Sequence, residues 1–158
     1  MTRFRLGSGL AAWSVLVLAS ALASQYLGGL QPCELCLWQR WPWLAAAVLG
    51  VASTLLPGSA RVLLALGAVA LVVGAGIAGF HVGVEQGWWA GTSACGGAAT
   101  PTDIEALRRQ LMAAPVVRCD APALVVLGLS MAAWNGLVSL ATALGLALGV
   151  RQAARWHA

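Results

Sequence analysis

The chain is organised around residues 31–40, Gln31-Pro32-Cys33-Glu34-Leu35-Cys36-Leu37-Trp38-Gln39-Arg40. Two cysteines stand three positions apart, a spacing that brings both sulfurs together in one helical turn or tight loop, and a long apolar run follows. If that run is a helix, its N-terminal end favours thiolate over thiol, and Arg40 adds a fixed positive charge. A cysteine pair in this cationic, half-exposed setting is typical of thiol–disulfide exchange, although a structural disulfide in a loop also fits the motif alone.

Composition places this stretch in a membrane protein. Of the 158 residues, 60% are hydrophobic and only 9% are charged, whereas soluble domains average roughly 25% charged residues. The nine basic residues lie at the ends of apolar segments and form no basic stripe, which excludes nucleic-acid binding. We therefore expect an all-α integral membrane protein with several spans.

Four apolar segments predict a four-transmembrane-helix bundle with two outer loops, all in one membrane domain of residues 1–158. Pro42 is tolerated near a helix start, which puts Arg40 either at the mouth of the second span or beside a kink. Glycines at near-helical spacing in the third span allow close helix approach, so this span is expected to pack centrally. Asn135 is polar within the fourth span and predicts an interhelical hydrogen bond. The predicted spans are about residues 9–27, 41–56, 62–82 and 122–150, and the outer loops are residues 28–40 and 83–121.

The second outer loop is expected to hold a short amphipathic surface helix. Thr102-Asp103-Ile104-Glu105 has the pattern of a capping box, and the apolar residues that follow fall on one face before Pro115. An ordinary loop helix that packs on the other loop explains this pattern equally well.

The placement of arginine predicts the orientation in the membrane. Five of the nine arginines lie near the chain ends or in the connection between the second and third spans, whereas the outer loops balance theirs with acidic residues. By the positive-inside rule the termini are cytoplasmic, so all four cysteines face outward, where disulfides persist. A zinc site would need a second close cysteine pair, and haem attachment would need a histidine directly after Cys36; the chain has neither.

The four cysteines together indicate an electron relay. A distant pair on a Gly-rich outer loop is placed to meet a soluble partner, and the close pair is placed to meet an acceptor dissolved in the bilayer, which means a quinone. The alternative is a four-helix membrane scaffold or assembly subunit with structural disulfides, whose cysteines would be inert to mild reductant. A lone histidine such as His81 at the far end of the third span is more often an interfacial side chain than a site.

Over nearly its whole length, the chain resembles the DsbB family of bacterial inner-membrane enzymes, which reoxidise the periplasmic thiol oxidase DsbA. It departs from the family at Gln39, where an acidic residue often stands, and at residues 124–126, which lack aromatic side chains. Vitamin K epoxide reductase relatives also pair Cys-x-x-Cys with loop cysteines, but in the reverse order along the chain. The matching residues are Pro32-Cys33-Glu34-Leu35-Cys36, Arg40, His81, Cys95, Cys119 and Leu127-Gly128-Leu129 with Met131.

The resemblance implies a multi-pass thiol:quinone oxidoreductase of the bacterial inner (plasma) membrane, with cytoplasmic termini and periplasmic cysteines. Such an enzyme takes electrons from a DsbA-like periplasmic thiol oxidase and passes them to a membrane quinone, ubiquinone or menaquinone, in support of disulfide bond formation. By the same resemblance, Cys95 and Cys119 meet the partner, and Cys33 and Cys36 are linked to the quinone. The residues implied to bind the quinone are Arg40, His81 and Met131.

The order of electron flow is also an expectation. Cys95 lies in a flexible Gly-rich stretch and is expected to be the better-exposed target for the partner, whose attack releases Cys119. Cys119 is then expected to form a transient bond with Cys33, which frees Cys36. Because Cys36 is nearer to Arg40, we expect it to be the better-stabilised thiolate.

Overall fold

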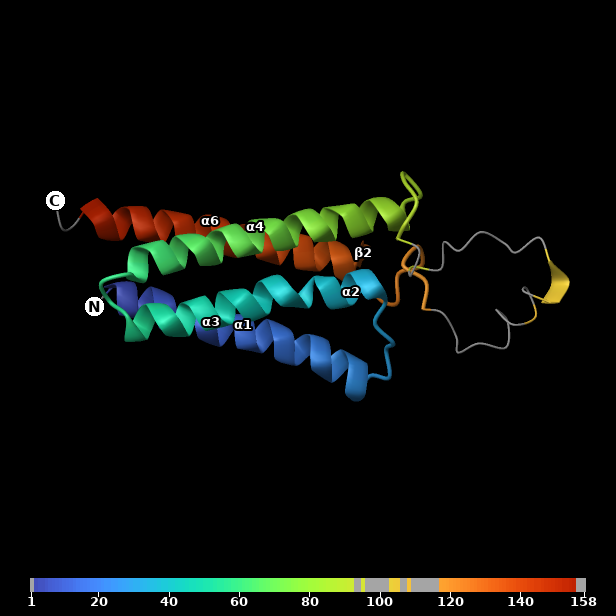
Figure 1. The fold of residues 1–158 in the computed structure, drawn as a ribbon, viewed down its shortest axis with the longest axis horizontal. Coiled ribbons are helices and arrows are strands. Elements are labelled where there is room, and N and C mark those ends of the chain that lie inside the picture. Colours follow the sequence, from blue (N-terminus) through green and yellow to red (C-terminus); the bar gives the residue numbers. More distant parts are fainter. Residues whose placement is uncertain (1, 93–94, 96–102, 106–107, 109–116, 156–158) are drawn as a thin grey trace.

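The computed structural model describes residues 2–92, 95, 103–105, 108 and 117–155. The bundle has four long helices side by side, which are α1 (Thr2–Tyr26), α3 (Arg40–Leu55), α4 (Ala60–Glu85) and α6 (Met131–Arg155). The start of α1 and the end of α6 lie at one end of it, and the short helix α2 (Glu34–Trp38) lies at the other (Figure 1). α1 packs against α3, α3 against α4 and α4 against α6, whereas α1 and α6 meet more sparsely. The described strands are β1 (Val125–Val126) and β2 (Leu129–Ser130).

The long helices have the character of a membrane bundle. Three of them, over Phe4–Tyr26, Ala60–Glu85 and Met131–Ala153, are long and apolar enough to cross a membrane. Large apolar side chains such as Leu16 and Val48 are more than half exposed, at 58% and 59%, a distribution that suits lipid and is unusual in water. The buried core along the bundle is formed by Leu10, Trp43, Ala46, Leu64, Leu71, Ala143 and Leu146.

The fourth long helix, α3, lies where the second span was predicted. Its 16 residues measure about 24 Å, which is shorter than the roughly 30 Å hydrocarbon core of a bilayer. In Figure 1, α2 continues the line of α3 beyond its start. The described part of the chain thus holds three helices of spanning length and a fourth that is consistent with a membrane helical bundle.

Pro42 explains the break between α2 and α3. A proline has no N–H, so the carbonyl of Trp38 cannot receive the usual helical hydrogen bond, and the proline ring crowds that carbonyl. Accordingly α2 ends at Trp38 and α3 begins at Arg40, with Gln39 between them. Arg40 therefore occupies the first turn of α3, directly after the break, and the short helix α2 lies within the predicted first outer loop.

The last long helix begins at Met131, so the prediction of one continuous segment over residues 122–150 was wrong at its start. Residues 125–130 instead form an antiparallel hairpin, a small exception to the all-α class. Its two-residue turn has positive φ at both positions, 52° at Leu127 and 80° at Gly128. This is the geometry of a type I′ turn, which matches the twist of a hairpin.

Two contacts determine where α6 begins. The hydroxyl of Ser130 accepts a hydrogen bond from the backbone N–H of Ala133 at 3.1 Å, which satisfies one of the free donors at the helix start. The indole N–H of Trp134 donates to the carbonyl of Val126 at 3.0 Å. The first turn of α6 is thus attached to the hairpin before it.

α4 packs between α3 and α6, as its glycines predicted, although not all of them take part. A Cβ added at Gly74 would lie 2.9 Å from the Cβ of Pro42, and one added at Gly67 would lie 3.0 Å from the side chain of Leu10. By contrast, Gly76 has nothing within 4 Å of such an atom. The close approach of α3 and α4 therefore depends on Gly74 in particular.

The remaining boundaries differ from the prediction at the helix ends. α1 begins at Thr2 rather than near residue 9, and α4 continues to Glu85, so His81 lies within this helix. In the second outer loop, Ile104, Glu105 and Arg108 are helical, and the rest of the predicted amphipathic helix lies outside the described residues. Which residues of each helix lie in the hydrocarbon stays a prediction.

Candidate redox-active site

A buried cluster brings the two cysteine pairs together. Cys33, Cys95 and Cys119 are each no more than 5% exposed and pack with Leu35, and Cys36 lies against them. The cluster joins the start of α2 to both ends of the second outer loop. Cysteines that are distant in the sequence are therefore neighbours in the fold.

Cys33 and Cys36 form a close pair of free thiols at the start of α2. Cys33 is the N-cap residue of this helix, and its sulfur accepts a hydrogen bond from the backbone N–H of Cys36 at 3.3 Å. The two Sγ atoms are 2.8 Å apart. A disulfide bond measures about 2.05 Å, so the pair needs only a small movement to close.

The surroundings favour a thiolate on Cys33. The pKa of Cys33 is lowered from 9.0 to about 4, chiefly because the Cys36 thiol donates a hydrogen bond to the Cys33 sulfur. Burial of the sulfur acts in the opposite direction and raises this pKa, and contacts with His81 and with the backbone N–H of Cys36 lower it further. The same contact with Cys33, followed by burial, raises the pKa of Cys36. We expected Cys36 to be the better-stabilised thiolate, but in the reduced pair the structure favours Cys33.

Buried polar groups from the break before α3 and from α4 lie beside Cys33. His81 is 3% exposed, and its Nε2 atom lies 3.6 Å from the sulfur of Cys33 and 3.8 Å from a carboxylate oxygen of Glu85. Its Nδ1 atom lies 2.8 Å from the side-chain nitrogen of Gln39. The structure thus places His81 against the cysteine pair, and it adds Glu85, which sequence reasoning did not single out.

The same three side chains form a potential metal-binding group. Sulfur atoms of Cys33 and Cys36 and a ring nitrogen of His81 all lie within 4.8 Å of one another. Thiolate and imidazole ligands suit zinc and other soft metal ions. We predicted no metal site, and this grouping leaves that prediction untested.

The loop pair, Cys95 and Cys119, forms a disulfide with a Cα–Cα distance of 5.0 Å. Cys95 is 5% exposed and Cys119 is fully buried, so Cys95 is the better exposed of the two, as predicted, although neither sulfur is open to a partner. Thr92 explains part of this burial, since its hydroxyl donates to the carboxylate of Glu34 at 2.5 Å and lies 3.2 Å from the sulfur of Cys95. The loop disulfide is thereby fastened to the start of α2.

Arg40 and Met131 lie apart from these contacts. The guanidinium of Arg40 donates to the side-chain oxygen of Gln25 on α1 at 2.8 Å. A guanidinium has five N–H donors, so further donors remain for a ligand. Met131 is 39% exposed at the first position of α6. Among the described residues, no contact assigns either side chain to a ligand, and their role in quinone binding stays a prediction.

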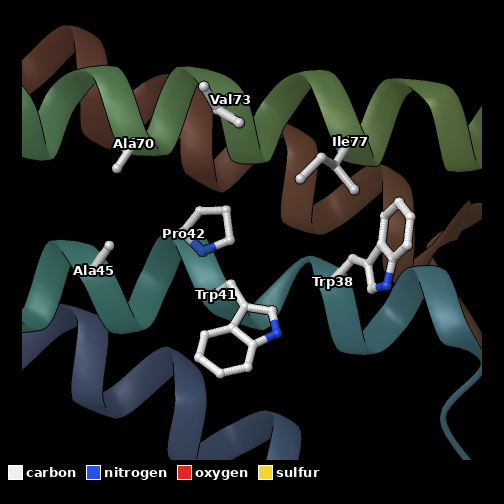
Figure 2. Close-up of a pocket in the computed structure, with 7 residues that line it drawn as sticks. All are labelled: Trp38, Trp41, Pro42, Ala45, Ala70, Val73 and Ile77. Atoms are coloured by element: carbon white, nitrogen blue, oxygen red, sulfur yellow. The ribbon is translucent and has the colours of Figure 1, made fainter.

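An apolar groove of about 480 Å³ lies between α3 and α4 (Figure 2). The ring of Pro42 points from α3 into the space between the two helices, opposite the side chains from α4. None of the residues predicted to bind the quinone lines it. The lining residues are Trp38, Trp41, Pro42, Ala45, Ala70, Val73 and Ile77.

Asn135 makes the interhelical hydrogen bond that the sequence predicted. Its side-chain oxygen accepts from the indole N–H of Trp43 at 2.8 Å, which joins α6 to α3. Sequence reasoning did not find Trp43 or Gln39 as its partners. A polar residue in an apolar helix signals that a partner exists, but it does not say on which helix the partner lies.

A disulfide and a dithiol in contact at one end of an apolar helical bundle define the class: a membrane protein with a redox-active cysteine centre. The family model described as disulfide bond formation protein DsbB matches residues 5–149, and the chain belongs to this family. The resemblance found in the sequence is thereby confirmed. The protein is accordingly an oxidoreductase of the membrane that acts in disulfide bond formation.

Two individual relatives carry the name of this family. Disulfide bond formation protein B of Cupriavidus metallidurans is 26% identical over 148 residues, which cover 87% of this chain and 86% of that protein. Disulfide bond formation protein B of Herminiimonas arsenicoxydans is 37% identical over 73 residues, 46% of each chain. An uncharacterized protein of Rickettsia prowazekii is 22% identical over 138 residues, 85% of this chain and 80% of that one. No solved structure matches the chain.

Proposed function

We propose that this protein is an inner-membrane thiol:quinone oxidoreductase that reoxidises a DsbA-like periplasmic dithiol oxidase and passes the electrons to a membrane quinone. The observation that carries the proposal is the buried cluster in which a disulfide packs against a dithiol. A scaffold stabilised by disulfides has no need for a second, reduced pair in that position. Family membership supports the same chemistry.

The orientation is part of this proposal. The start of α1 and the end of α6 lie at the end of the bundle opposite α2 and its cysteines (Figure 1). With the arginines concentrated near the chain ends, the positive-inside rule puts those ends in the cytoplasm. The cysteine cluster then faces the periplasm, where the partner is found.

The first exchange takes place at the loop disulfide. A thiolate of the partner attacks the sulfur of Cys95, the Cys95–Cys119 bond breaks, and Cys119 leaves as a thiolate. The second thiolate of the partner then displaces Cys95, so the partner gains a disulfide while the loop pair takes up two electrons. Because Cys95 is buried, docking of the partner has to uncover it.

The second exchange moves the electrons to the close pair. The Cys119 thiolate attacks Cys33 in the Cys33–Cys36 disulfide, which forms a transient Cys33–Cys119 bond and frees Cys36. Attack of Cys95 on Cys119 then restores the loop disulfide and leaves Cys33 and Cys36 reduced. The bonding pattern in the structure, with a loop disulfide beside two free thiols, corresponds to the state after this exchange.

Arg40, in the first turn of α3, offers groups that fit a quinone. A quinone supplies an acceptor for the two electrons and two protons that are released when the dithiol closes to a disulfide. Half-buried Arg40 has N–H donors for a carbonyl oxygen beyond the one that it gives to Gln25. Trp38 follows Cys36 by two positions, about 200° round the helix, so the two side chains point to opposite faces of α2. The apolar groove that Trp38 lines therefore suits the apolar tail of a quinone rather than its reacting ring.

The test is anaerobic turnover of the purified protein with a thioredoxin-like dithiol and ubiquinone. We expect one quinol for each partner disulfide formed. Cys33→Ala should abolish quinol formation and still allow a single exchange between the loop disulfide and the partner. Ser139→Ala, a buried change on α6 away from the cysteines, is the control and should leave turnover unchanged. Oxidation of the partner without quinol would contradict the proposal.

A further inference from the structure

A chain of hydrogen bonds crosses the bundle and ends at the cysteine pair. The indole nitrogen of Trp43 lies 2.8 Å from the side-chain oxygen of Asn135, and the Asn135 nitrogen lies 2.7 Å from the side-chain oxygen of Gln39. The Gln39 nitrogen lies 2.8 Å from Nδ1 of His81, whose Nε2 atom lies 3.6 Å from the sulfur of Cys33. Trp43, Gln39 and His81 are each no more than 5% exposed, and Asn135 is half-buried, so water has little access to most of these groups.

The chain has only one consistent direction, because an indole N–H donates and never accepts. Asn135 must therefore turn its oxygen toward Trp43 and its NH₂ group toward Gln39. Gln39 accepts with its oxygen and presents its own NH₂ group to His81. Nδ1 of His81 then has to accept, so the proton of the neutral imidazole sits on Nε2, the atom nearest Cys33.

We propose that Asn135 is a positioning residue that acts through Gln39 to hold His81 in its Nε2-protonated tautomer, with the N–H directed at the sulfur of Cys33. In this tautomer the ring donates to the thiolate. In the other tautomer a lone pair would face the negative sulfur and repel it. The inference deepens the proposed function, on which it rests for the use made of the thiolate.

The position of Gln39 needs a side chain that can accept one hydrogen bond and donate another, which an amide can do. Its amide accepts from Asn135 and donates to His81, whereas a carboxylate would present an oxygen to both and draw the imidazole proton to Nδ1. Cys36, from α2, also faces the reacting sulfur. Two further groups compete for the ring proton of His81: the carboxylate of Glu85, 3.8 Å from Nε2, and the backbone carbonyl of Cys119. The hydrogen bonds from Asn135 to Gln39 and from Gln39 to His81 hold the imidazole ring in place and oppose a rotation that would direct Nε2 at Glu85 instead of Cys33.

The direct test is the ¹⁵N spectrum of histidine-labelled protein with Cys33 and Cys36 reduced. The chain has two histidines, and His157→Asn assigns the signals. At neutral pH we expect His81 to show a protonated Nε2 and a bare Nδ1. A protonated Nδ1 with a bare Nε2, or an equal mixture of the two forms, would overturn the proposal without the need for any other variant.

Asn135→Leu removes both links that Asn135 makes and lets the amide of Gln39 turn over. We expect a mixture of His81 tautomers. In a background with Cys95→Ser and Cys119→Ser, the pH midpoint for alkylation of Cys33 should rise by about one to two units, the usual effect of losing one hydrogen bond to a charged group.

The matched control is Ser139→Ala, one turn further along α6. The hydroxyl of Ser139 is buried and has no hydrogen-bond partner among the described residues, so the tautomer and the midpoint should both stay as they are. A folded Asn135→Leu protein with an unchanged tautomer and midpoint would refute the positioning role. Neither measurement uses a quinone or a partner, so a failure of the proposed function would appear separately, as lost turnover with an intact tautomer.

Discussion

Replacing Cys36 by alanine should raise the pKa of Cys33 by several units. The hydrogen bond from Cys36 is the largest of the effects that bring this pKa from 9.0 to about 4. The backbone N–H of residue 36 and His81 remain in the variant, and burial of the sulfur opposes them. At pH 6, a thiol of pKa 4 is about 99% thiolate, whereas one of pKa 9 is about 0.1% thiolate.

The assay should follow the pH midpoint of alkylation rather than the rate at one pH. The nucleophilicity of a thiolate falls by about 0.4 to 0.5 log units for each unit of lowered pKa. A shift of five units therefore slows the fully ionised sulfur by roughly 100- to 300-fold and hides part of the gain in ionisation. Iodoacetamide labelling of the Cys33 peptide, quantified by mass spectrometry from pH 3 to 10, separates the two effects.

Cys95→Ser and Cys119→Ser in both proteins leave only the close pair to react. With Cys36 present we expect a midpoint near pH 4, and with alanine in its place a midpoint at least about two units higher. A midpoint near 9 in the presence of Cys36, or the same midpoint in both proteins, would refute the assignment of the thiolate to Cys33.

Three further predictions concern the quinone side, the fold and pH. Arg40→Ala should slow quinone reduction and leave exchange between the partner and the loop disulfide intact; equal loss of both half-reactions would mean that Arg40 serves folding. Gly74→Val, whose Cβ would lie 2.9 Å from Pro42, should cost about 1–3 kcal/mol of stability and lower the thermal midpoint. Gly76→Val, at a position with nothing within 4 Å, should leave the midpoint unchanged. Equal effects of the two variants would refute the close approach of α3 and α4. The pKa of Cys33 is lower in the folded protein than in the unfolded chain, so the Cys33 thiolate stabilises the fold. This contribution to the free energy of unfolding is fully present above the unfolded pKa and is lost as pH falls through about 4. Thermal unfolding of reduced and oxidised protein across this range should therefore diverge with pH, and a constant difference would contradict the shift.

The membrane class and the family could be predicted because their signals are local in the sequence. Apolar composition and the spacing of Cys33 and Cys36 do not depend on how the helices pack. The start of α6 could not be found in this way, since Val125 and Val126 are as apolar as the helix that follows. The signals that distinguish the hairpin are Gly128 in its turn and Ser130 as the cap of α6.

The composition of the site was harder to predict than its cysteines. His81, Gln39 and Asn135 come from three separate segments, and only the packing of the helices brings them to one place. Each alone is an ordinary polar residue in or near an apolar helix. The burial of Cys95 could not be predicted either, because a Gly-rich sequence does not reveal that Thr92 bonds to Glu34 and holds the loop against α2.

Transfer between the two cysteine pairs is the central claim, and a cross-pair disulfide tests it most directly. In a protein with Cys36→Ser and Cys95→Ser, only Cys33 and Cys119 keep their thiols, and both belong to the buried cluster. Mild oxidation, followed by non-reducing digestion and mass spectrometry, should find an intramolecular Cys33–Cys119 bond in nearly every molecule, at a rate independent of protein concentration. Thiols that stay free, or that cross-link only between molecules, would contradict the relay and leave the loop disulfide as a structural bond.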